Sequence, residues 1–189
     1  MHTLVRLFFI AILATTLTSA PAVSQGNRTR FVRDAEIENI IRRYAMPIFN
    51  VAGLSADAVN IYLVRDDGLN AFVAGGQRLF INTGLLIRAK SPDQVIGVIA
   101  HEAGHIAGGH LSRIHDELRN AELKSILATV VGVAVGVATG NGRAASAIVR
   151  GGQGVALTDL LKYSRIQESA ADAAALKYLD ATGQSARGI

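Results

Sequence analysis

Residues 101–110, HEAGHIAGGH, bring three of the chain's five histidines together with one glutamate. On a helix, positions four apart share a face, so His101 and His105 present their rings in the same direction. Two imidazoles placed in this way suit two ligands of one tetrahedral zinc ion. Glu102 lies about 60° around the helix from His105 and about 100° from His101, at 3.6 residues per turn. It can therefore line the same cleft as a general base that acts on water at the metal.

Two further histidines follow closely but do not extend this motif. The metzincin pattern requires a third histidine at position 111, where the chain has Leu111. If the helix continues, His110 points about 160° away from the mean direction of the pair. We therefore expect His110 and His115 to lie on the surface or to contact a ligand, and not to bind the metal. A solvated histidine pair without a metal is the alternative interpretation of HEAGH itself.

A third ligand must come from elsewhere in the chain, and a carboxylate commonly joins two histidines at catalytic zinc. The segment YSRIQESAAD, residues 163–172, places Glu168 and Asp172 four positions apart on one face of a second predicted helix. One carboxylate can bind the metal, while the other accepts a hydrogen bond from the free ring nitrogen of a ligand histidine. The alternative is an ordinary solvated acidic face.

The elements ahead of the histidine motif predict an α+β fold. An amphipathic helix and three short strands are expected at residues 34–49, 59–64, 70–74 and 78–82. Turn signals separate the strands, so we expect a small antiparallel β-meander. Ser91-Pro92-Asp93-Gln94 then predicts a helix start, with serine as cap, proline in the first turn and glutamine closing a capping box. The apolar residues that follow predict a core helix that runs directly into His101.

Residues 125–142 carry no charge and are rich in valine, alanine and glycine. Gly132, Gly136 and Gly140 stand four apart, a spacing that permits close packing of helices. The run is short of large apolar residues and marginal in length for a bilayer, which takes about 20 residues. We therefore favour a buried helical hairpin, with membrane insertion as the alternative. A charged helix is predicted to follow at residues 158–179.

The N-terminus has the layout of a secretory signal peptide. Arg6 stands in a short positive region, Leu7–Leu17 is almost wholly apolar, and small residues follow. The apolar run is too short to span a bilayer as a helix. We expect residues 1–22 to be a signal peptide, residues 30–189 to form one domain, and the protein to be exported to a bacterial periplasm.

The composition narrows the classes of partner. The chain contains no cysteine, which excludes disulfides and a cysteine nucleophile. Its formal net charge of +4 comes without an arginine-rich run or interleaved aromatic residues, so we expect no nucleic-acid partner. We interpret the mild positive excess as an aid to solubility or as weak attraction to an anionic membrane surface.

These features together resemble the gluzincin metallopeptidase family that includes the heat-shock membrane protease HtpX, CAAX prenyl proteases and the periplasmic β-barrel assembly-enhancing protease. The similarity rests on HEAGH (101–105), YSRxxExxAD (163–172) and NAFVAGGQRLFINTGLL (70–86), and it spans residues 35 to 189. The signal peptide and the lack of definite membrane spans favour the soluble periplasmic branch. Ala170 stands where many relatives have an acid, so one peripheral charge is missing.

The resemblance implies a mostly helical, zincin-like metalloprotease domain with one Zn²⁺ ion per chain, held by His101, His105 and Glu168. It implies that Glu102 is the general base and that Asp172 supports a ligand histidine. It also implies that an edge strand aligns an extended peptide, a mode of recognition that strand edges permit. The residues of this strand are Asn70, Ala71, Phe72, Val73 and Ala74.

The function that the resemblance implies is that of a zinc-dependent endopeptidase of the cell envelope. Its expected substrates are misfolded or stalled polypeptides, among them outer-membrane β-barrel precursors. The assembly machinery of these precursors is an expected partner, and peripheral membrane association is compatible with this role. Relatives continue beyond the segment that resembles ATGQSARGI (181–189). We therefore expect that the domain lacks its C-terminal continuation. The alternative is a chaperone-like binding module of the same fold with weak or regulated proteolysis.

Overall fold

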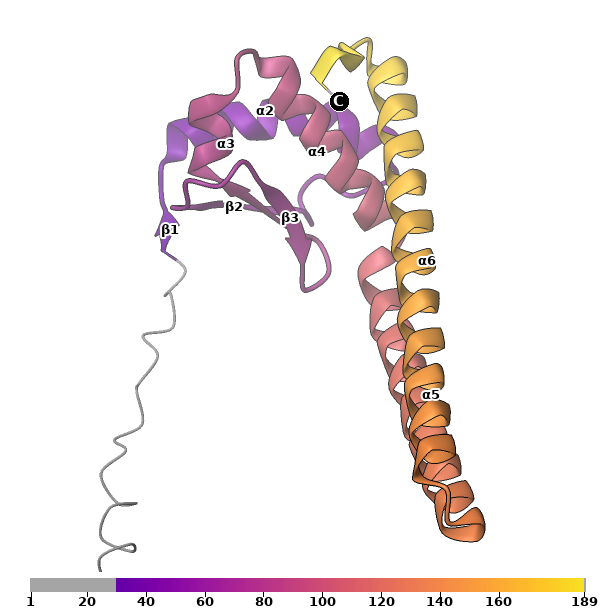
Figure 1. Cartoon of the computed structure of the whole chain (residues 1–189). Helices are drawn as coiled ribbons and strands as arrows, with labels where there is room; N and C mark the ends of the chain where they lie inside the picture. Colours follow the sequence, from indigo (N-terminus) through magenta and orange to yellow (C-terminus); the bar gives the residue numbers. More distant parts are fainter. Residues whose placement is uncertain (1–29, 189) are drawn as a thin grey trace, which may run out of the picture.

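The computed structural model describes residues 30–188, which form a head and a long helical hairpin (Figure 1). In chain order the elements are β1 (Phe31–Val32), α2 (Ala35–Val51), β2 (Asn60–Val64), β3 (Ala71–Ala74), β4 (Arg78–Asn82), α3 (Thr83–Arg88), α4 (Pro92–Ala107), α5 (His110–Thr139), α6 (Gly142–Thr182) and the 3₁₀ helix η1 (Ala186–Gly188). The predicted α+β class, mostly helical, is confirmed. The signal peptide predicted for residues 1–22 lies outside the described residues.

The four strands form one mixed sheet in the order β1-β2-β4-β3. β2 runs parallel to β4, while β3 pairs antiparallel with β4 after the turn at Gly75-Gly76, where both glycines have positive φ. The three predicted strands form at the expected residues to within one position, but the predicted antiparallel meander is wrong. The reason is burial. Leu79 and Ile81 of β4 are fully buried and take the inner position, whereas the short β3, with its exposed Phe72, occupies the edge.

The hydrophobic core lies between one face of the sheet and helices α2, α4 and α6. Its fully buried members include Phe49, Leu63, Ile81, Ile99 and Leu179. α4 begins as predicted, with Ser91 at the N-cap position and Pro92 in the first turn. The Gln94 side chain accepts a hydrogen bond from the backbone N–H of Lys90, whereas the Ser91 side chain makes no cap hydrogen bond. The predicted core helix that leads into His101 is confirmed.

Aromatic side chains line up across the strands on the sheet. Phe80 of β4 stacks on Tyr62 at 5.1 Å between ring centroids and on Phe72 at 5.0 Å. Phe31 of β1 lies 5.9 Å from Tyr62. Cross-strand aromatic pairs typically contribute about 0.2–1 kcal/mol each. This row therefore helps to hold the edge strand β3 in register against β4.

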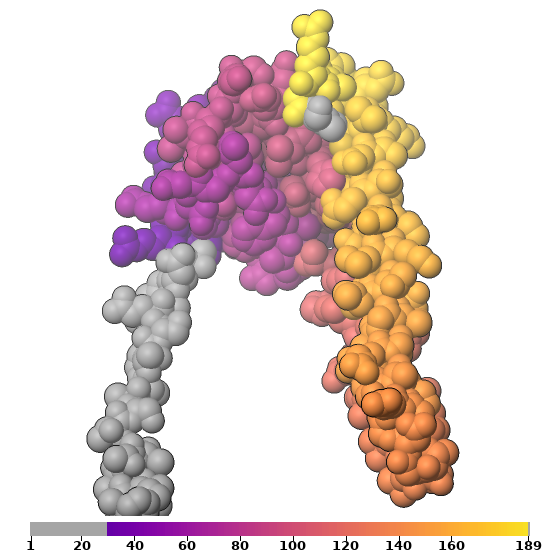
Figure 2. Space-filling view, viewed as in Figure 1, coloured from indigo at the N-terminus to yellow at the C-terminus, as the bar shows by residue number. Residues whose placement is uncertain are grey.

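α5 and α6 form an antiparallel hairpin that projects from the head (Figure 1, Figure 2). The chain turns at Gly140 and Asn141, and the Asn141 side chain caps α6 by accepting hydrogen bonds from two backbone N–H groups at 3.1 Å. The predicted hairpin is present, but its predicted burial is wrong. Only 11% of the most apolar 18-residue window of α5 is buried, because this part of the hairpin extends beyond the head (Figure 1).

α4 and α6 approach each other closely at Gly104. A Cβ atom at this position would lie 3.0 Å from the carbonyl oxygen of Ala171 and 3.1 Å from its Cα, both backbone atoms of α6. Backbone atoms cannot rotate away, so a larger residue must push the two helices apart. Gly104 therefore sets the distance between the histidine helix and the helix that carries Glu168 and Asp172.

We expect Gly104→Val to lower the free energy of unfolding by about 1–3 kcal/mol, the usual cost of an overpacked contact. Gly154→Val is the matched control, because a Cβ on this glycine of α6 meets nothing within 4 Å. Urea unfolding followed by circular dichroism measures both variants. Superimposable unfolding curves for the two variants would contradict the close contact.

Candidate metal centre

His101 and His105 of α4 face Glu168 of α6, and one potential ligand atom from each lies within 4.8 Å of the others. The two Nε2 atoms are 3.0 Å apart. The Glu168 carboxylate oxygens lie 3.4 Å from Nε2 of His101 and 3.7 Å from Nε2 of His105. Ligands about 2.0–2.2 Å from a tetrahedral zinc ion stand roughly 3.3–3.6 Å apart. The three side chains therefore fit one metal ion without rearrangement of the helices.

Asp172 lies on the other side of the His101 ring and determines which nitrogen faces the metal position. Its Oδ1 is 2.8 Å from Nδ1 of His101. Because a carboxylate only accepts, Nδ1 carries the proton, and Nε2 is left with the free lone pair that a metal ion requires. This contact matches the role that the sequence predicts for one of the two carboxylates on this helix.

His110 contacts His105, although a continuous helix would turn it away from the motif. α4 ends at Ala107, and Gly109 adopts a left-handed conformation with φ 63° before α5 begins. His110 is therefore only 7% exposed, and its Nδ1 lies 3.0 Å from Nδ1 of His105. The expected direction of His110 is wrong because the helix breaks. The sequence predicts that His110 and His115 each contact a ligand or lie on the surface. His110 contacts the candidate ligand His105, and His115 is exposed.

The contact with His110 selects the tautomer of His105. With Nε2 directed at the metal position, the Nδ1–H of His105 donates to Nδ1 of His110. Burial lowers the pKa of both histidines, which favours the neutral rings that this arrangement needs. A Cβ on Gly108 would overlap the His110 ring, so the ring folds back only because that side chain is absent. The Gly108-Gly109 pair is the sequence signal that could have predicted this break.

Glu102 is buried near the metal position but is not one of the three converging groups. Burial raises the pKa of Glu102 to about 7, and the nearby charge of Glu168 adds to the rise. A backbone hydrogen bond from Val73 acts in the opposite direction. A carboxyl group with a pKa near neutrality can both accept and return a proton at physiological pH. Glu102 thus has the property that a general base requires.

The predicted edge strand is at the edge of the sheet, where β3 pairs with β4 alone among the described strands. The backbone oxygen of Asn70 accepts a hydrogen bond from the N–H of Asn82 at 3.0 Å. Hydrogen-bonded and non-bonded pairs alternate in an antiparallel ladder, so the backbone polar groups of Ala71 and Val73 face away from β4. The effect of the Val73 backbone amide, which lowers the pKa of Glu102, agrees with this direction.

An open hollow of about 330 Å³ adjoins the metal position on the side of the β3–β4 turn. Gly75 and Gly76 line it on one side, and His105 and the start of α5 line it on the other. Phe72 and Ala74 belong to the strand that leads into this turn. The hollow therefore connects the end of the edge strand with one of the candidate metal ligands.

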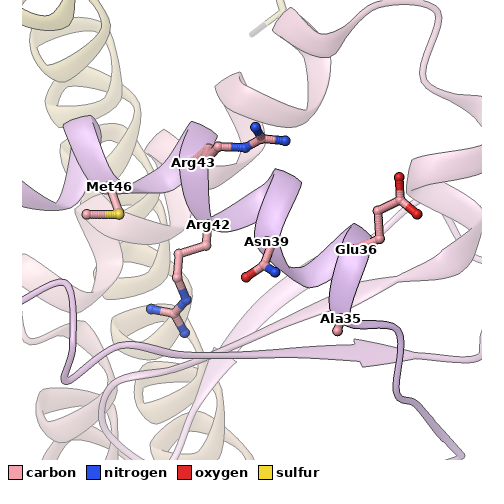
Figure 3. Close-up of a pocket in the computed structure, with 6 residues that line it drawn as sticks. All are labelled: Ala35, Glu36, Asn39, Arg42, Arg43 and Met46. Atoms are coloured by element: carbon pink, nitrogen blue, oxygen red, sulfur yellow. The ribbon is translucent and has the colours of Figure 1, made fainter.

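A second hollow lies on α2 and has no metal-binding chemistry (Figure 3). Its lining residues are Ala35, Glu36, Asn39, Arg42, Arg43 and Met46. Glu36 lies in the first turn of α2, where an acidic side chain stabilises the N-terminus of a helix. Arg42 donates a hydrogen bond to the backbone oxygen of Ala56. Glu36 and Arg42 thus serve the local structure.

Comparison with known proteins connects the chain with one group of enzymes. Residues 32–189 match Peptidase family M48. The chain is 27% identical over 93 residues to the Beta-barrel assembly-enhancing protease of Escherichia coli O157:H7, which covers 49% of this chain and 19% of that protein. It is 33% identical over 70 residues to Mitochondrial metalloendopeptidase OMA1 of Schizosaccharomyces pombe (37% and 21%). It is 42% identical over 64 residues to Protease HtpX of Escherichia coli O1:K1 (32% and 21%). The matched segments span only 19% to 21% of these three curated relatives.

In the metal-free protein, ionisation of Glu102 should make folding less favourable as the pH rises. The folded state holds the proton up to a pKa of about 7, whereas an unperturbed glutamate releases it near 4.5. Stability is therefore lost as the pH rises between these two values, and the loss is complete above the higher one. We expect Glu102→Gln, which cannot ionise, to raise the free energy of unfolding by on the order of 1–3 kcal/mol at about pH 8, and by much less at about pH 5. Urea unfolding in the presence of a chelator measures this, and an equal gain at both pH values would contradict the assignment.

We expect His110→Ala to retain one metal ion per chain but to bind it about 10–100-fold more weakly, the usual cost of losing a partner of a ligand. His105→Ala removes a ligand and should lose the metal. His115→Ala, at an exposed position of α5, is the control and should bind as the wild type does. Metal content after dialysis and a metal titration distinguish the variants. Equal loss of metal from His110→Ala and His105→Ala would show that His110 is itself a ligand.

Proposed function

The chain belongs to peptidase family M48, a family of metallopeptidases, and we propose that it is a zinc-dependent endopeptidase. His101, His105 and Glu168 hold one zinc ion in this proposal. The observation that carries it is the convergence of these three side chains from two helices within 4.8 Å. Two histidines and one carboxylate form the ligand set of many catalytic zinc sites, and they leave one position open for water or substrate.

The residues around the ligands supply orientation and proton transfer. Zinc, when bound, supplies Lewis acid chemistry, since it polarises the peptide carbonyl group and lowers the pKa of water. The carboxylate of Glu102 takes a proton from the attacking water and returns it to the amine that leaves. Asp172 holds the ring of His101 in the tautomer that presents Nε2. His110 does the same for His105.

We propose that the edge strand β3, with Asn70 before it, binds polypeptide substrates in an extended conformation. The outward N–H and C=O groups of Ala71 and the outward C=O group of Val73 can pair with a substrate strand, which is recognition by strand addition. Such pairing depends little on side chains, so it suits substrates of varied sequence. The backbone amide of Val73 lowers the pKa of Glu102 and therefore lies near it, so a strand that pairs with β3 passes next to the general base.

We infer that the protein acts in the cell envelope. One relative is named a beta-barrel assembly-enhancing protease, and the first residues of this chain have the layout of a secretory signal peptide. Export would bring the enzyme to the periplasm. There it would cleave misfolded or stalled polypeptides, among them outer-membrane β-barrel precursors at their assembly machinery.

The site carboxylates should respond differently to amide substitution. Glu102→Gln should keep zinc and lower casein cleavage by about 10²–10⁴-fold, because the base is lost while all three ligands remain. Glu168→Gln should weaken zinc binding as well as cleavage, since an amide oxygen is an uncharged and poorer ligand. Asp172→Asn should fall between them, with a loss of about 10–100-fold. Zinc titration and cleavage of casein measure the order.

Glu122→Gln is the matched control, because Glu122 is exposed on α5 and outside the site, so it should alter neither property. A chelator should abolish cleavage by the wild type, and added zinc should restore it. Loss of zinc from Glu102→Gln together with full retention by Glu168→Gln would reverse the assigned roles. A wild-type protein that binds zinc and casein without cleaving it would instead support the chaperone-like binding module.

A further inference from the structure

The part of the α5–α6 hairpin that lies farthest from the head is almost free of charge. We call residues 125–158 the distal hairpin; Figure 2 shows the hairpin standing clear of the head. Its α5 half, Ser125–Thr139, contains no charged residue, and its α6 half contains only Arg143 and Arg150. α5 is long and apolar enough to cross a membrane. It is neither a buried core helix nor an N-terminal segment, the two usual reasons why a soluble protein contains such a helix.

The charges begin at the same level on both helices. Lys124 of α5 and Asp159 of α6 form an ion pair at 2.6 Å, directly at the boundary of the distal hairpin. On the head side of this pair, charged residues are frequent on both helices: Arg113, Asp116, Glu117, Arg119, Glu122, Lys162 and Arg165. A charge boundary that crosses two antiparallel helices at one level indicates a planar change of environment.

In the distal hairpin, glycines pack between the helices, and most of the large aliphatic residues face outward. A Cβ on Gly132 would lie 2.8 Å from the carbonyl oxygen of Ala145, and one on Gly136 would lie 2.9 Å from the Ala145 Cβ, so both glycines pack directly against α6. Most large aliphatic side chains are exposed instead: Ile126, Leu127, Val130, Val131, Val133, Val137, Val155 and Leu157. Val135, Ile148 and Val149 are half-buried. In water the large side chains would be expected between the helices. Small residues at the interface are typical of helices that pack within lipid.

The exposed apolar side chains do not form a single stripe. Val130, Val131 and Val133 point in directions spread over about 160° of the circumference of α5, at 100° per residue. The rest of that circumference faces α6, which carries exposed aliphatic residues of its own. A protein partner or a second copy would cover one side of the hairpin, whereas lipid surrounds it. The distribution therefore favours a bilayer.

We propose that the distal hairpin inserts tip first into a lipid bilayer, with the Lys124–Asp159 pair at the level of the headgroups. Ser125–Thr139 is about 22 Å long at 1.5 Å per residue, so the hairpin crosses most of a hydrocarbon core that is about 30 Å thick. Arg143, next to the tip, can extend its charge to the far headgroups. Arg150 donates to Oγ of Ser146 at 3.0 Å, one turn nearer the tip, so its guanidinium group already points in that direction.

A fluorescent probe on a single cysteine tests this insertion in the full-length chain, which has no cysteine of its own. Val137→Cys places an environment-sensitive label on the distal hairpin, where Val137 is 82% exposed. Ile87→Cys is the control in α3 of the head, where Ile87 is 78% exposed. With vesicles of phosphatidylethanolamine and phosphatidylglycerol, the label at 137 should shift to the blue and become protected from iodide, while the label at 87 should not change. Because the readout is local, binding of vesicles by the N-terminal apolar segment cannot produce it.

A charge substitution tests whether the apolar surface of the distal hairpin inserts into lipid. Val137→Asp should lower partitioning of the distal hairpin into vesicles by about 100-fold, the cost of a charge within the bilayer, measured with a label on Val133→Cys. Ile87→Asp should have no effect. Both variants should cleave casein as the wild type does, so this test can fail while the proposed peptidase activity stands.

Two results would overturn the proposal. One is a label at 137 that iodide still quenches when vesicles are present. The other is a label at 137 that is equally protected without vesicles, in a protein that sediments as a dimer, because the face would then be an interface between two copies.

Discussion

The close contact between α4 and α6 is the constraint on which the metal centre depends. His101 and His105 lie one turn apart around Gly104, and Glu168 and Asp172 lie one turn apart beside Ala171. Each pair shares a face of its own helix, but neither pair makes a site alone. The two pairs meet because the missing side chain at position 104 lets the backbones approach. Gly104, which has no side chain, thereby brings the three candidate ligands together. It also places the carboxylate of Asp172 where it orients the His101 ring.

The helix break after α4 has two consequences for function. It turns the ring of His110 back to His105, so that both candidate histidine ligands have a hydrogen-bond partner on Nδ1. It also gives α5 a new direction, which carries the chain away from the head and into the hairpin (Figure 1). Gly108 and Gly109 permit this, one by leaving room for an imidazole and the other by adopting positive φ. The same two residues thus complete the site and begin the projecting hairpin.

The proposed membrane contact and the proposed active site lie on the same helix, α6. Glu168 follows Asp159 by about 14 Å along the helix axis, at 1.5 Å per residue. With Asp159 at the headgroups, the site would stand close to the membrane surface, with the edge of β3 beside it. A bilayer-anchored enzyme of this shape would meet polypeptides that emerge from or fail to enter the membrane. This agrees with the proposed substrates and gives the hairpin a role that the hydrolytic chemistry does not require.

The sequence by itself determined the features that depend on local periodicity. The placement of each pair of site residues on one helix face and the start of α4 at Ser91-Pro92 are as predicted. The strands form within one residue of the predicted ranges. Each of these features is encoded within a few helical turns or one strand. The tertiary structure alone decided which strand lies beside β2, where His110 points and whether the hairpin is buried. The strand order and the exposure of the hairpin depend on contacts between distant segments. The direction of His110 depends on a helix break that helical periodicity cannot predict. A periodic pattern specifies which residues share a face, but only the packed chain shows what that face meets.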